Sequence, residues 1–549
     1  MEGVFLNEAR LALEAKRGIW PDRVLTDYFD RWVETRPDDT AIIAYREEEG
    51  TTTRWTYREL NARAARIAEA LAGMGVARGD VVSFQLPNWW EFIAVHLACV
   101  RLGAASNPLM PIFRHRELSF MLGHAESKVL IVPARFRGFD HEALAAQLGR
   151  ELPRLEHVLA IAANGDHSLE ARVAAGAAGT AFDRGAALAP NDVMQLLYTS
   201  GTTGEPKGVM HTSNTLLGAV AKFAERLELG PSDVIFMPSP LAHQLGFSYG
   251  MLMPLVLGIP LVLTDIWNPA RAADLIERYR ATFTFAATPF LADLAHLPGI
   301  ESRRLDTLRV FVSSGAPIPP AIVQATQEKL RTTVVTCWGM TECASVTTTA
   351  LSGHKVLESD GSPLPSGEVR VVDADGTAAP RGTVGTLKVR GPTLFVGYLK
   401  RPRLYDVDEA GWFDTGDLAR MDEEGFIRIC GREKDIIIRG GENIPVIEVE
   451  AAMYRMPEVA DAAIVAMPDP RLVERACAFV TPRPGRSLTL DRVRAHLAAE
   501  GVAKHFWPER LELLREMPRT PTGKIQKFVL RELAKGLAPD RRVAQAQAS

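Results

Sequence analysis

The sequence contains few cysteines, and they show no pattern of a metal site or a disulfide framework. The five are Cys99, Cys337, Cys343, Cys430 and Cys477. None of them forms a Cys-x-x-Cys pair, so neither zinc nor a set of disulfides is indicated. Because isolated thiols are typical of a reducing compartment, the sequence predicts a cytoplasmic protein.

The sequence also lacks a long apolar run and a strong charge of one sign. The longest apolar run, Gly250 to Leu263, is interrupted by Pro254, Gly258 and Pro260 and is too short to cross a membrane. Charged residues throughout Met1 to Trp20 leave no apolar segment for a signal peptide. The formal net charge of −4 gives no nucleic-acid or polybasic membrane-binding pattern. The sequence therefore predicts neither a membrane span nor a nucleic-acid partner.

The order of the hydrophobic segments indicates an α/β protein with more than one domain. A chain of 549 residues is too long for a single core. Before about Lys355, short apolar runs typical of buried strands alternate with helical patterns, which implies mostly parallel sheets covered by helices. After that point, short alternating segments between Gly and Pro turns indicate a small antiparallel, barrel-like unit. A smaller α+β segment follows Gly431, with helices expected at 446–454 and 490–499.

Two helices in the first part have boundaries that the sequence marks. The segment from Thr56 to Glu59 is a capping box, and Gly73 and Gly75 end the helix that it begins. The apolar segment from Trp90 to Leu102 predicts a second helix, which ends at Gly103.

The stretch Thr199 to Gly208, with the sequence TSGTTGEPKG, has a composition suited to binding phosphate. An apolar, strand-like run precedes it, and a helical pattern begins near Ser213. Its glycines permit backbone angles closed to other residues, and successive N–H groups in such a loop can surround an anion. Lys207 adds a compact positive charge. The spacing is not that of a Walker A loop, and the alternative interpretation is a flexible surface turn.

The segment from Tyr198 to Gly208 closely resembles the phosphate loop of the adenylate-forming (ANL) superfamily. That superfamily includes acyl- and aryl-CoA synthetases, peptide-synthetase adenylation domains and firefly luciferase. Further motifs extend the resemblance over nearly the whole chain. The resemblance implies that ATP is held by Thr199, Ser200, Gly201, Thr202, Thr203, Gly204 and Lys207.

The motif CWGMTE, from Cys337 to Glu342, resembles the aromatic-Gly-x-Thr-Glu motif of the superfamily. Trp338 replaces the usual Tyr and can still stack on adenine. The resemblance implies that Thr341 bonds a phosphate oxygen and that Glu342 offers carboxylate oxygens to Mg²⁺. A lone Glu is otherwise a solvated surface residue. Gly339 and Met340 complete this part of the nucleotide site.

Two more segments resemble nucleotide-contacting motifs. Gly315, Ala316 and Pro317 follow a predicted strand and match the loop that lies along the adenine, although a tight turn is the simpler interpretation. Asp417 ends the motif GWFDTGD, where the superfamily uses an Asp to accept both ribose hydroxyls. Arg432 follows in the next motif and is also expected at the ribose.

The resemblance divides the chain at a hinge. It implies an AMP-binding domain over 1–431, a hinge over 432–434 with Lys434 as the pivot, and a mobile domain over 435–549. The loop of Gly440, Gly441 and Glu442 matches the channel for the pantetheine arm of CoA, and its paired glycines suit a narrow passage.

Lys524 lies in PRTPTGKIQK, which matches the C-terminal lysine motif of the superfamily. The motif implies that Lys524 bridges the attacking carboxylate and the α-phosphate. Outside such a motif, a lysine in a Gly/Pro loop near the C-terminus is a solvated charge. With Glu342, Thr341 and His243 it completes the predicted catalytic set.

The acyl pocket is predicted around His243, together with Phe247, Ser248 and Thr336. A lone His is more often structural, and the assignment rests on the resemblance of its segment to the aromatic motif of the superfamily. No Asp occurs from Ser239 to Tyr249 to hold an α-amino group, which argues against amino-acid substrates.

Two segments outside the catalytic motifs bear on the substrate. FQLPNWW from Phe84 and NPLMPIF from Asn107 look similar to cyclohexanecarboxylate-CoA ligases and medium-chain acyl-CoA synthetases. The resemblance implies an enzyme that uses ATP, Mg²⁺ and CoA to convert a medium-chain or alicyclic carboxylate into a thioester. The alternatives are a ligase that loads a separate carrier protein and a non-catalytic nucleotide-binding protein. The oligomeric state is left open, a homodimer included.

Overall fold

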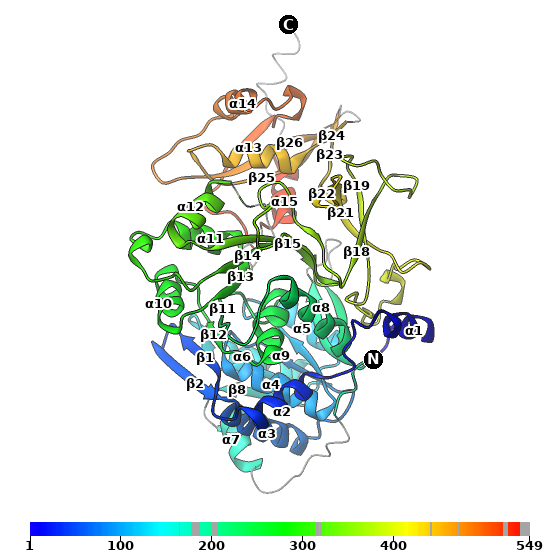
Figure 1. Ribbon diagram of the computed structural model, residues 1–549, viewed down its shortest axis with the longest axis vertical. Helices are drawn as coiled ribbons and strands as arrows, with labels where there is room; N and C mark the ends of the chain where they lie inside the picture. Colours follow the sequence, from blue (N-terminus) through cyan, green and yellow to red (C-terminus); the bar gives the residue numbers. More distant parts are fainter. Residues whose placement is uncertain are drawn as a thin grey trace.

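The computed structural model describes residues 1–163, 165–176, 187–199, 206–314, 318, 320–439, 442–469, 472–519 and 525–537. Two large sheets with helices on them form the first part of the chain, and an antiparallel sheet and a separate α+β domain follow (Figure 1). The predicted α/β fold class is confirmed. No helix within these residues is long and apolar enough to cross a membrane.

The larger of the two sheets holds nine strands of the described chain. Its central strands, from β15 to β1, pair in parallel, and its two ends are antiparallel. In spatial order the strands are β17 (Ser362–Pro363), β16 (Ala344–Thr348), β15 (Thr333–Met340), β14 (Val310–Ser314), β13 (Phe283–Ala287), β11 (Ile235–Met237), β12 (Leu261–Thr264), β1 (Thr40–Arg46) and β2 (Thr51–Thr56).

The second sheet holds seven described strands, of which those from β9 to β8 pair in parallel. In spatial order they are β20 (Gly397–Tyr398), β10 (Lys207–Thr212), β9 (Val193–Thr199), β4 (Ala105–Pro108), β3 (Val81–Phe84), β5 (Val129–Pro133) and β8 (His157–Ile161). The small hairpin β6 (Arg135–Phe136) and β7 (Phe139–Asp140) stands apart.

The helices of this part confirm the two predicted boundaries. Thr56 caps α3, with its hydroxyl accepting from the Glu59 N–H at 3.2 Å, and α4 ends at Gly103. The helices are α1 (Glu8–Arg17), α2 (Leu25–Thr35), α3 (Tyr57–Gly73), α4 (Trp90–Leu102), α5 (His115–Ala125), α6 (His141–Glu151), α7 (Leu169–Gly176), α8 (Ser213–Arg226), α9 (Met253–Leu257), α10 (Pro269–Tyr279), α11 (Thr288–Ala295) and α12 (Pro320–Leu330).

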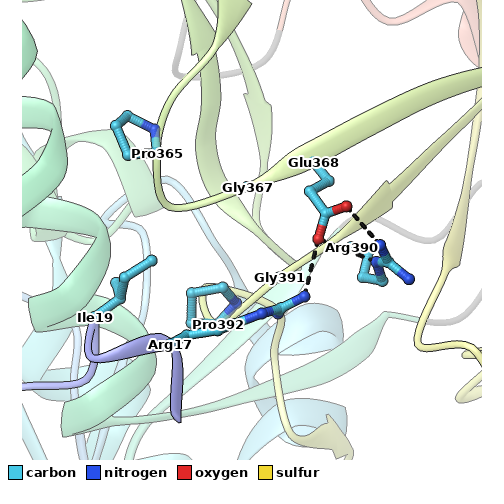
Figure 2. A pocket seen from close by; sticks show the side chains of 8 residues that line it. All are labelled: Arg17, Ile19, Pro365, Gly367, Glu368, Arg390, Gly391 and Pro392. Atoms are coloured by element: carbon cyan, nitrogen blue, oxygen red, sulfur yellow. Dashed lines mark hydrogen bonds and ion pairs between the residues drawn. The ribbon is translucent and has the colours of Figure 1, made fainter. Parts of the chain in front are cut away.

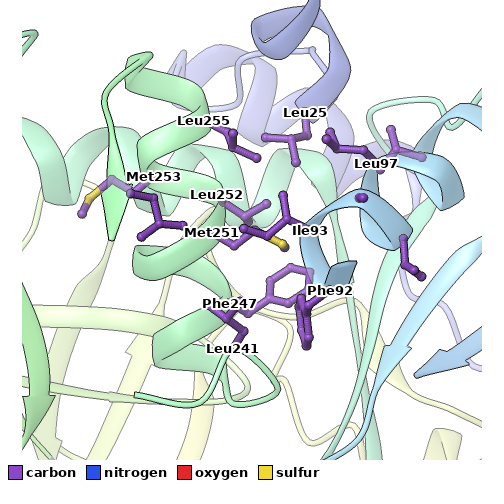
Figure 3. Packing of buried hydrophobic residues seen from close by; sticks show 14 of the residues in the cluster. Leu25, Phe92, Ile93, Leu97, Leu241, Phe247, Met251, Leu252, Met253 and Leu255 are labelled. Carbon is purple, nitrogen blue, oxygen red and sulfur yellow. The ribbon is translucent and has the colours of Figure 1, made fainter. Parts of the chain in front are cut away.

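Helix α4 lies at the centre of the largest core because it is apolar on nearly all sides. Phe92 and Ile93 pack against Phe247 and Leu252 of the neighbouring segment (Figure 3). That segment is a fully buried π-helix, η3 (Gly246–Leu252), which the sequence did not predict.

Two glycines let η3 pack as closely as it does. A Cβ on Gly246 would lie 2.1 Å from the Pro240 carbonyl oxygen, and one on Gly250 would lie 2.4 Å from Met237 Cγ. Neither position has room for a side chain, so the close approach depends on glycine.

The remaining sheets belong to the last third of the chain. The predicted antiparallel unit is a sheet of β18 (Glu368–Val372), β19 (Gly385–Arg390), β21 (Phe413–Met421) and β22 (Ile427–Arg432). The α+β domain at the top of Figure 1 contains β23 (Ile437–Arg439), β24 (Glu442–Ile444), β25 (Val459–Asp469), β26 (Val473–Pro482), β27 (Arg510–Leu513), α13 (Val446–Tyr454), α14 (Leu490–Ala499) and α15 (Lys527–Lys535). Helices α13 and α14 have the predicted boundaries.

All five cysteines are free thiols, and only Cys430 is partly exposed. Burial raises the pKa of Cys99, Cys337 and Cys477 to about 12. These thiols are therefore protonated and unreactive at neutral pH.

Candidate active site

The hairpin β9–β10 holds the two ends of the predicted phosphate loop side by side. Thr199 and Lys207 are directly opposite each other in its register, so Lys207 lies at the foot of the loop. The loop residues Ser200, Gly201, Thr202, Thr203 and Gly204 lie outside the described residues, and their contacts with ATP stay predictions.

Tyr398 contacts both Lys207 and Glu342. No sequence motif singled out this tyrosine. The ammonium of Lys207 lies 4.9 Å from the centroid of the Tyr398 ring. The Tyr398 hydroxyl donates to Glu342 Oε1 at 2.8 Å. Because Tyr398 and Glu342 are 56 residues apart, no local spacing reveals this contact.

Glu342 is a buried carboxylate with basic groups near it. Burial raises its pKa, while the Tyr398 hydrogen bond and the charges of Lys207 and Arg432 act in the opposite direction. Its carbonyl accepts from the Phe395 N–H at 2.7 Å, which fixes the backbone beside it. The predicted ligand therefore lies in an enclosed, positively charged setting rather than on a solvated surface.

Trp338, Asp417 and Arg432 form a second polar group. The indole N–H of Trp338 donates to Asp417 Oδ2 at 2.9 Å. Arg432 Nε lies 2.9 Å from Asp417 Oδ1 in an ion pair, and the two residues are neighbours in the β21–β22 register. Apart from this ion pair, no hydrogen-bond donor reaches the buried Oδ1 within the described chain. The carboxylate therefore keeps an acceptor position free, which fits the predicted ribose contact.

His211 supports the Thr341–Glu342 segment from the phosphate-loop strand. Its Nε2 lies 2.7 Å from the Thr341 carbonyl oxygen, and its Nδ1 lies 3.0 Å from Thr215 Oγ1. Complete burial lowers the pKa of His211 to about 4, so the ring is neutral at pH 7. Since a carbonyl only accepts, Nε2 carries the proton and donates to Thr341.

The Trp338–Met340 segment must stay close to the strand beside it. A Cβ on Gly339 would lie 2.1 Å from the Ala344 carbonyl oxygen. The β15–β16 register shifts between Trp338 and Gly339, near the end of the strand Thr333–Met340. Glycine at position 339 is therefore needed for this strand to pack closely against the backbone at Ala344.

The residues predicted for the acyl pocket lie in or next to the large core. Phe247 makes an edge contact with His96, with ring centroids 4.9 Å apart. Ser248 is fully buried and accepts from Gln244 Nε2 at 2.9 Å. Thr336 donates to the Ser359 carbonyl at 3.1 Å, and the Leu245 N–H approaches His243 Nδ1 at 3.4 Å. Their contacts with a substrate stay predictions.

Asn88 holds the segment that leads to His243, and the sequence analysis gave it no role beyond lineage. Its side-chain amide donates to the carbonyls of Ser239 at 2.9 Å and Thr264 at 3.1 Å. Its Oδ1 accepts from the Leu241 N–H at 2.8 Å. Asn88 therefore fixes the loop between β11 and η3 on which the predicted pocket depends.

Several predicted positions can be placed only in part. Lys434 lies in the short 3₁₀ turn η6 (Glu433–Asp435), and Glu442 begins β24. Outside the described residues lie Gly315, Ala316, Pro317, Gly440, Gly441 and Lys524.

A small cavity of about 130 Å³ lies on another part of the protein (Figure 2). Glu368 accepts from Arg17 at 2.9 Å and from Arg390 at 3.1 Å across its wall. Arg17 also pairs with Glu14, so two carboxylates balance the two guanidinium groups. Ligand pockets are usually larger, about 300 Å³ and above. We therefore assign these residues to holding the N-terminal segment against the antiparallel sheet. The lining residues are Arg17, Ile19, Pro365, Gly367, Glu368, Arg390, Gly391 and Pro392.

Comparison with known proteins identifies the family. The AMP-binding enzyme family matches residues 29–399, and the AMP-binding enzyme C-terminal domain matches residues 448–524. The chain belongs to the AMP-binding enzyme family. The predicted membership of the adenylate-forming superfamily is thereby confirmed.

Curated members of the AMP-binding enzyme family are similar over nearly their whole length. The medium-chain fatty-acid–CoA ligase of Escherichia coli K12 is 36% identical, over 96% of this chain and 93% of its own. A salicylyl-CoA synthase / salicylate adenylyltransferase of a Streptomyces species is 35% identical, over 95% of each chain. The predicted class, an AMP-forming acid–thiol ligase, is confirmed.

A solved member of the family has the same fold. The crystal structure of the anthranilate CoA ligase AuaEII in complex with anthranoyl-AMP is 25% identical, with a TM-score of 0.84 over 94% of this chain and 99% of that one.

Proposed function

We propose that the protein joins a medium-chain or alicyclic carboxylate to CoA in two steps, through an acyl-adenylate. The observation that carries this proposal is a pair of buried carboxylates at the CWGMTE motif: Glu342 lies in the motif and is bonded to Tyr398, and Asp417 comes from a second motif and is bonded to Trp338. Glu342 is suited to bind a metal ion beside the phosphates, and Asp417 is suited to bind the ribose. The similarity to a salicylate adenylyltransferase that is also a CoA synthase supports the two-step order.

In the first step, a carboxylate oxygen of the substrate attacks the α-phosphorus of ATP. The bond from that phosphorus to the bridging oxygen breaks, and pyrophosphate leaves. Lys207 and Lys524 balance the charge that develops, and Asp417 with Arg432 holds the ribose. No protein nucleophile is required.

In the second step, the CoA sulfur attacks the acyl carbon of the adenylate. The bond between that carbon and the phosphate oxygen breaks, AMP leaves, and the thiol proton is lost to solvent. We assign the passage of the pantetheine arm to Gly440, Gly441 and Glu442. Because these residues and Lys524 serve different steps, the domain over 435–549 turns on the hinge at 432–434, with Lys434 as the pivot.

Mg²⁺ fits the residues near the phosphate loop. Among the described residues, no three His, Cys, Asp or Glu side chains gather to enclose an ion. Mg²⁺ usually takes one or two carboxylates and completes its shell with phosphate oxygens and water. Glu342 is the carboxylate suited to this, and the ion would neutralise charge on the ATP phosphates.

The substrate class follows from what surrounds His243. Leu241 and Phe247, which lie on the same segment as His243, are buried and apolar. No Asp is available from Ser239 to Tyr249 to pair with an ammonium group, and a buried unpaired cation is costly. The similarity to a medium-chain fatty-acid–CoA ligase supports an uncharged acyl chain. The proposed partners are therefore this carboxylate, ATP and CoA.

A substrate panel tests the proposal. We expect cyclohexanecarboxylate and hexanoate to exceed acetate in kcat/KM by about two orders of magnitude, because each additional buried methylene contributes about 0.8 kcal/mol. We expect them to exceed leucine as well, because its ammonium group would be buried without a partner. AMP release would be measured with and without CoA, using benzoate as an aromatic control. CoA-independent turnover with a carrier protein would favour the carrier-loading alternative, and no AMP under any condition would favour a nucleotide-binding protein. Preference for acetate or leucine would contradict the pocket assignment alone.

The metal assignment predicts a second result. Glu342→Gln keeps the shape of the side chain but removes its charge, so we expect half-maximal activity to require about tenfold more Mg²⁺. Glu156→Gln, at an exposed position, serves as the control. An Mg²⁺ titration with the midpoint of the wild type would remove Glu342 from the ligand set.

A further inference from the structure

We propose that Tyr398 is a positioning residue that holds Lys207 and Glu342 near each other while preventing them from pairing directly. This inference rests on the proposed function, because it concerns the two charged groups assigned to the phosphates and Mg²⁺. Tyr398 would act through these groups and would not touch the reacting atoms.

The two charges come from different sheets and meet at one side chain. Lys207 begins β10 in the seven-stranded sheet, whereas Glu342 follows β15 in the nine-stranded sheet. The face of the Tyr398 ring lies toward the ammonium at 4.9 Å, and the hydroxyl donates to the carboxylate at 2.8 Å. A cation near the face of an aromatic ring is attracted by it, so each charge has its own contact with the tyrosine.

Opposite charges in an enclosed place attract strongly. Lys207 and Glu342 both contact Tyr398, yet within the described chain they form no ion pair with each other. In a direct ion pair, the ammonium and the carboxylate would neutralise each other. With Tyr398 between them, both remain directed to a ligand.

The backbone on both sides of Tyr398 is fixed. The Val396 N–H donates to the Met210 carbonyl and the Leu399 N–H to the Gly208 carbonyl, each at 2.9 Å. A Cβ on Gly397 would lie 1.9 Å from the Gly3 carbonyl oxygen, so the chain passes here without room to shift.

The ring itself is also held. It packs edge-on against Phe395, with centroids 4.7 Å apart, and Tyr398 is only 2% exposed. A side chain held in this way is suited to set a distance between two other groups.

The alternative is that Tyr398 only fills space in the core. Two substitutions distinguish this packing role from a positioning role. Tyr398→Phe keeps the ring, its packing and the contact with Lys207, and removes only the hydroxyl. Tyr398→Leu removes the ring as well. The matched control is Tyr405→Phe, which removes a partly buried hydroxyl that accepts from Arg10 at 2.8 Å and contacts neither charged group.

The experiment measures metal binding directly. Mn²⁺ binding in the presence of ATP would be followed by electron paramagnetic resonance, alongside the Mg²⁺ dependence of AMP release. We expect Tyr398→Phe to weaken Mn²⁺ binding and to raise the Mg²⁺ midpoint by about tenfold, since a hydrogen bond to a charged group is lost. Tyr398→Leu should weaken both further, whereas Tyr405→Phe should match the wild type.

A double variant tests whether Tyr398 acts through Glu342. If it does, adding Tyr398→Phe to Glu342→Gln should change Mn²⁺ binding by less than twofold, because the charged ligand that Tyr398 positions is already lost. Equal Mn²⁺ binding by Tyr398→Phe and the wild type, or full additivity in the double variant, would overturn the proposal. A wild type that binds Mn²⁺ and ATP but releases no AMP would overturn the proposed function instead, and Tyr398 would still be judged by binding.

Discussion

Lys524→Ala is expected to slow acyl-adenylate formation by about two to three orders of magnitude, the usual effect of removing one charge-stabilising donor. Thioester formation from supplied acyl-adenylate should stay within a few-fold of the wild type, because the phosphorus centre has already reacted. Pyrophosphate exchange measures the first step, and CoA-dependent AMP release from supplied adenylate measures the second. Lys535→Ala, an exposed lysine of α15 paired with Glu532, is the control.

The reciprocal variant is Gly441→Leu, which places a side chain in the proposed CoA passage. It should slow the second step and spare the first. Equal losses in both steps by Lys524→Ala would contradict its assignment, and normal thioester formation by Gly441→Leu would move the CoA passage elsewhere.

Asp417→Asn is expected to lower kcat/KM for ATP by about two to three orders of magnitude. The change removes the charged acceptor proposed for the two ribose hydroxyls, and a hydrogen bond to a charged group is worth about 1.5–3 kcal/mol. It also leaves the partly exposed Arg432 without its carboxylate at 2.9 Å. The amide oxygen can still accept from Trp338, so packing should be largely kept.

Asp417→Asn should affect only the binding and use of the nucleotide. AMP binding, measured by calorimetry, should weaken together with ATP use, while KM for CoA stays unchanged. Asp375→Asn, in an exposed turn, is the control. A variant that binds AMP as tightly as the wild type would show that Asp417 does not hold the ribose.

Patterns confined to one segment could be predicted from the sequence. The capping box at Thr56, the helix ending at Gly103 and the helices at 446–454 and 490–499 depend on residues within a few positions of each other. The strand before the phosphate loop and the helix that begins at Ser213 were also predictable from their apolar patterns, whereas the strand β10 between the loop and that helix was not predicted.

Contacts between distant segments could not be predicted in this way. Tyr398 reaches Glu342 across 56 positions, and the two lie in different sheets. Asn88 meets the Ser239 carbonyl across 151 positions. Such contacts depend on how strands are ordered in space, which residue spacing does not encode. The candidate site was therefore predictable as a set of motifs, but not as the network that joins them.

The π-helix η3 has a consequence for how substrate range could diverge among relatives. A π turn holds an additional residue compared with an α turn, and an α-helix advances by about 100° per residue. Deleting one residue between Gly246 and Leu252 would therefore rotate Phe247 and Ser248 relative to the helix that follows. Loss of a single codon would thus change the direction of several side chains of this segment at once. Substitutions at constant chain length change only the individual side chains.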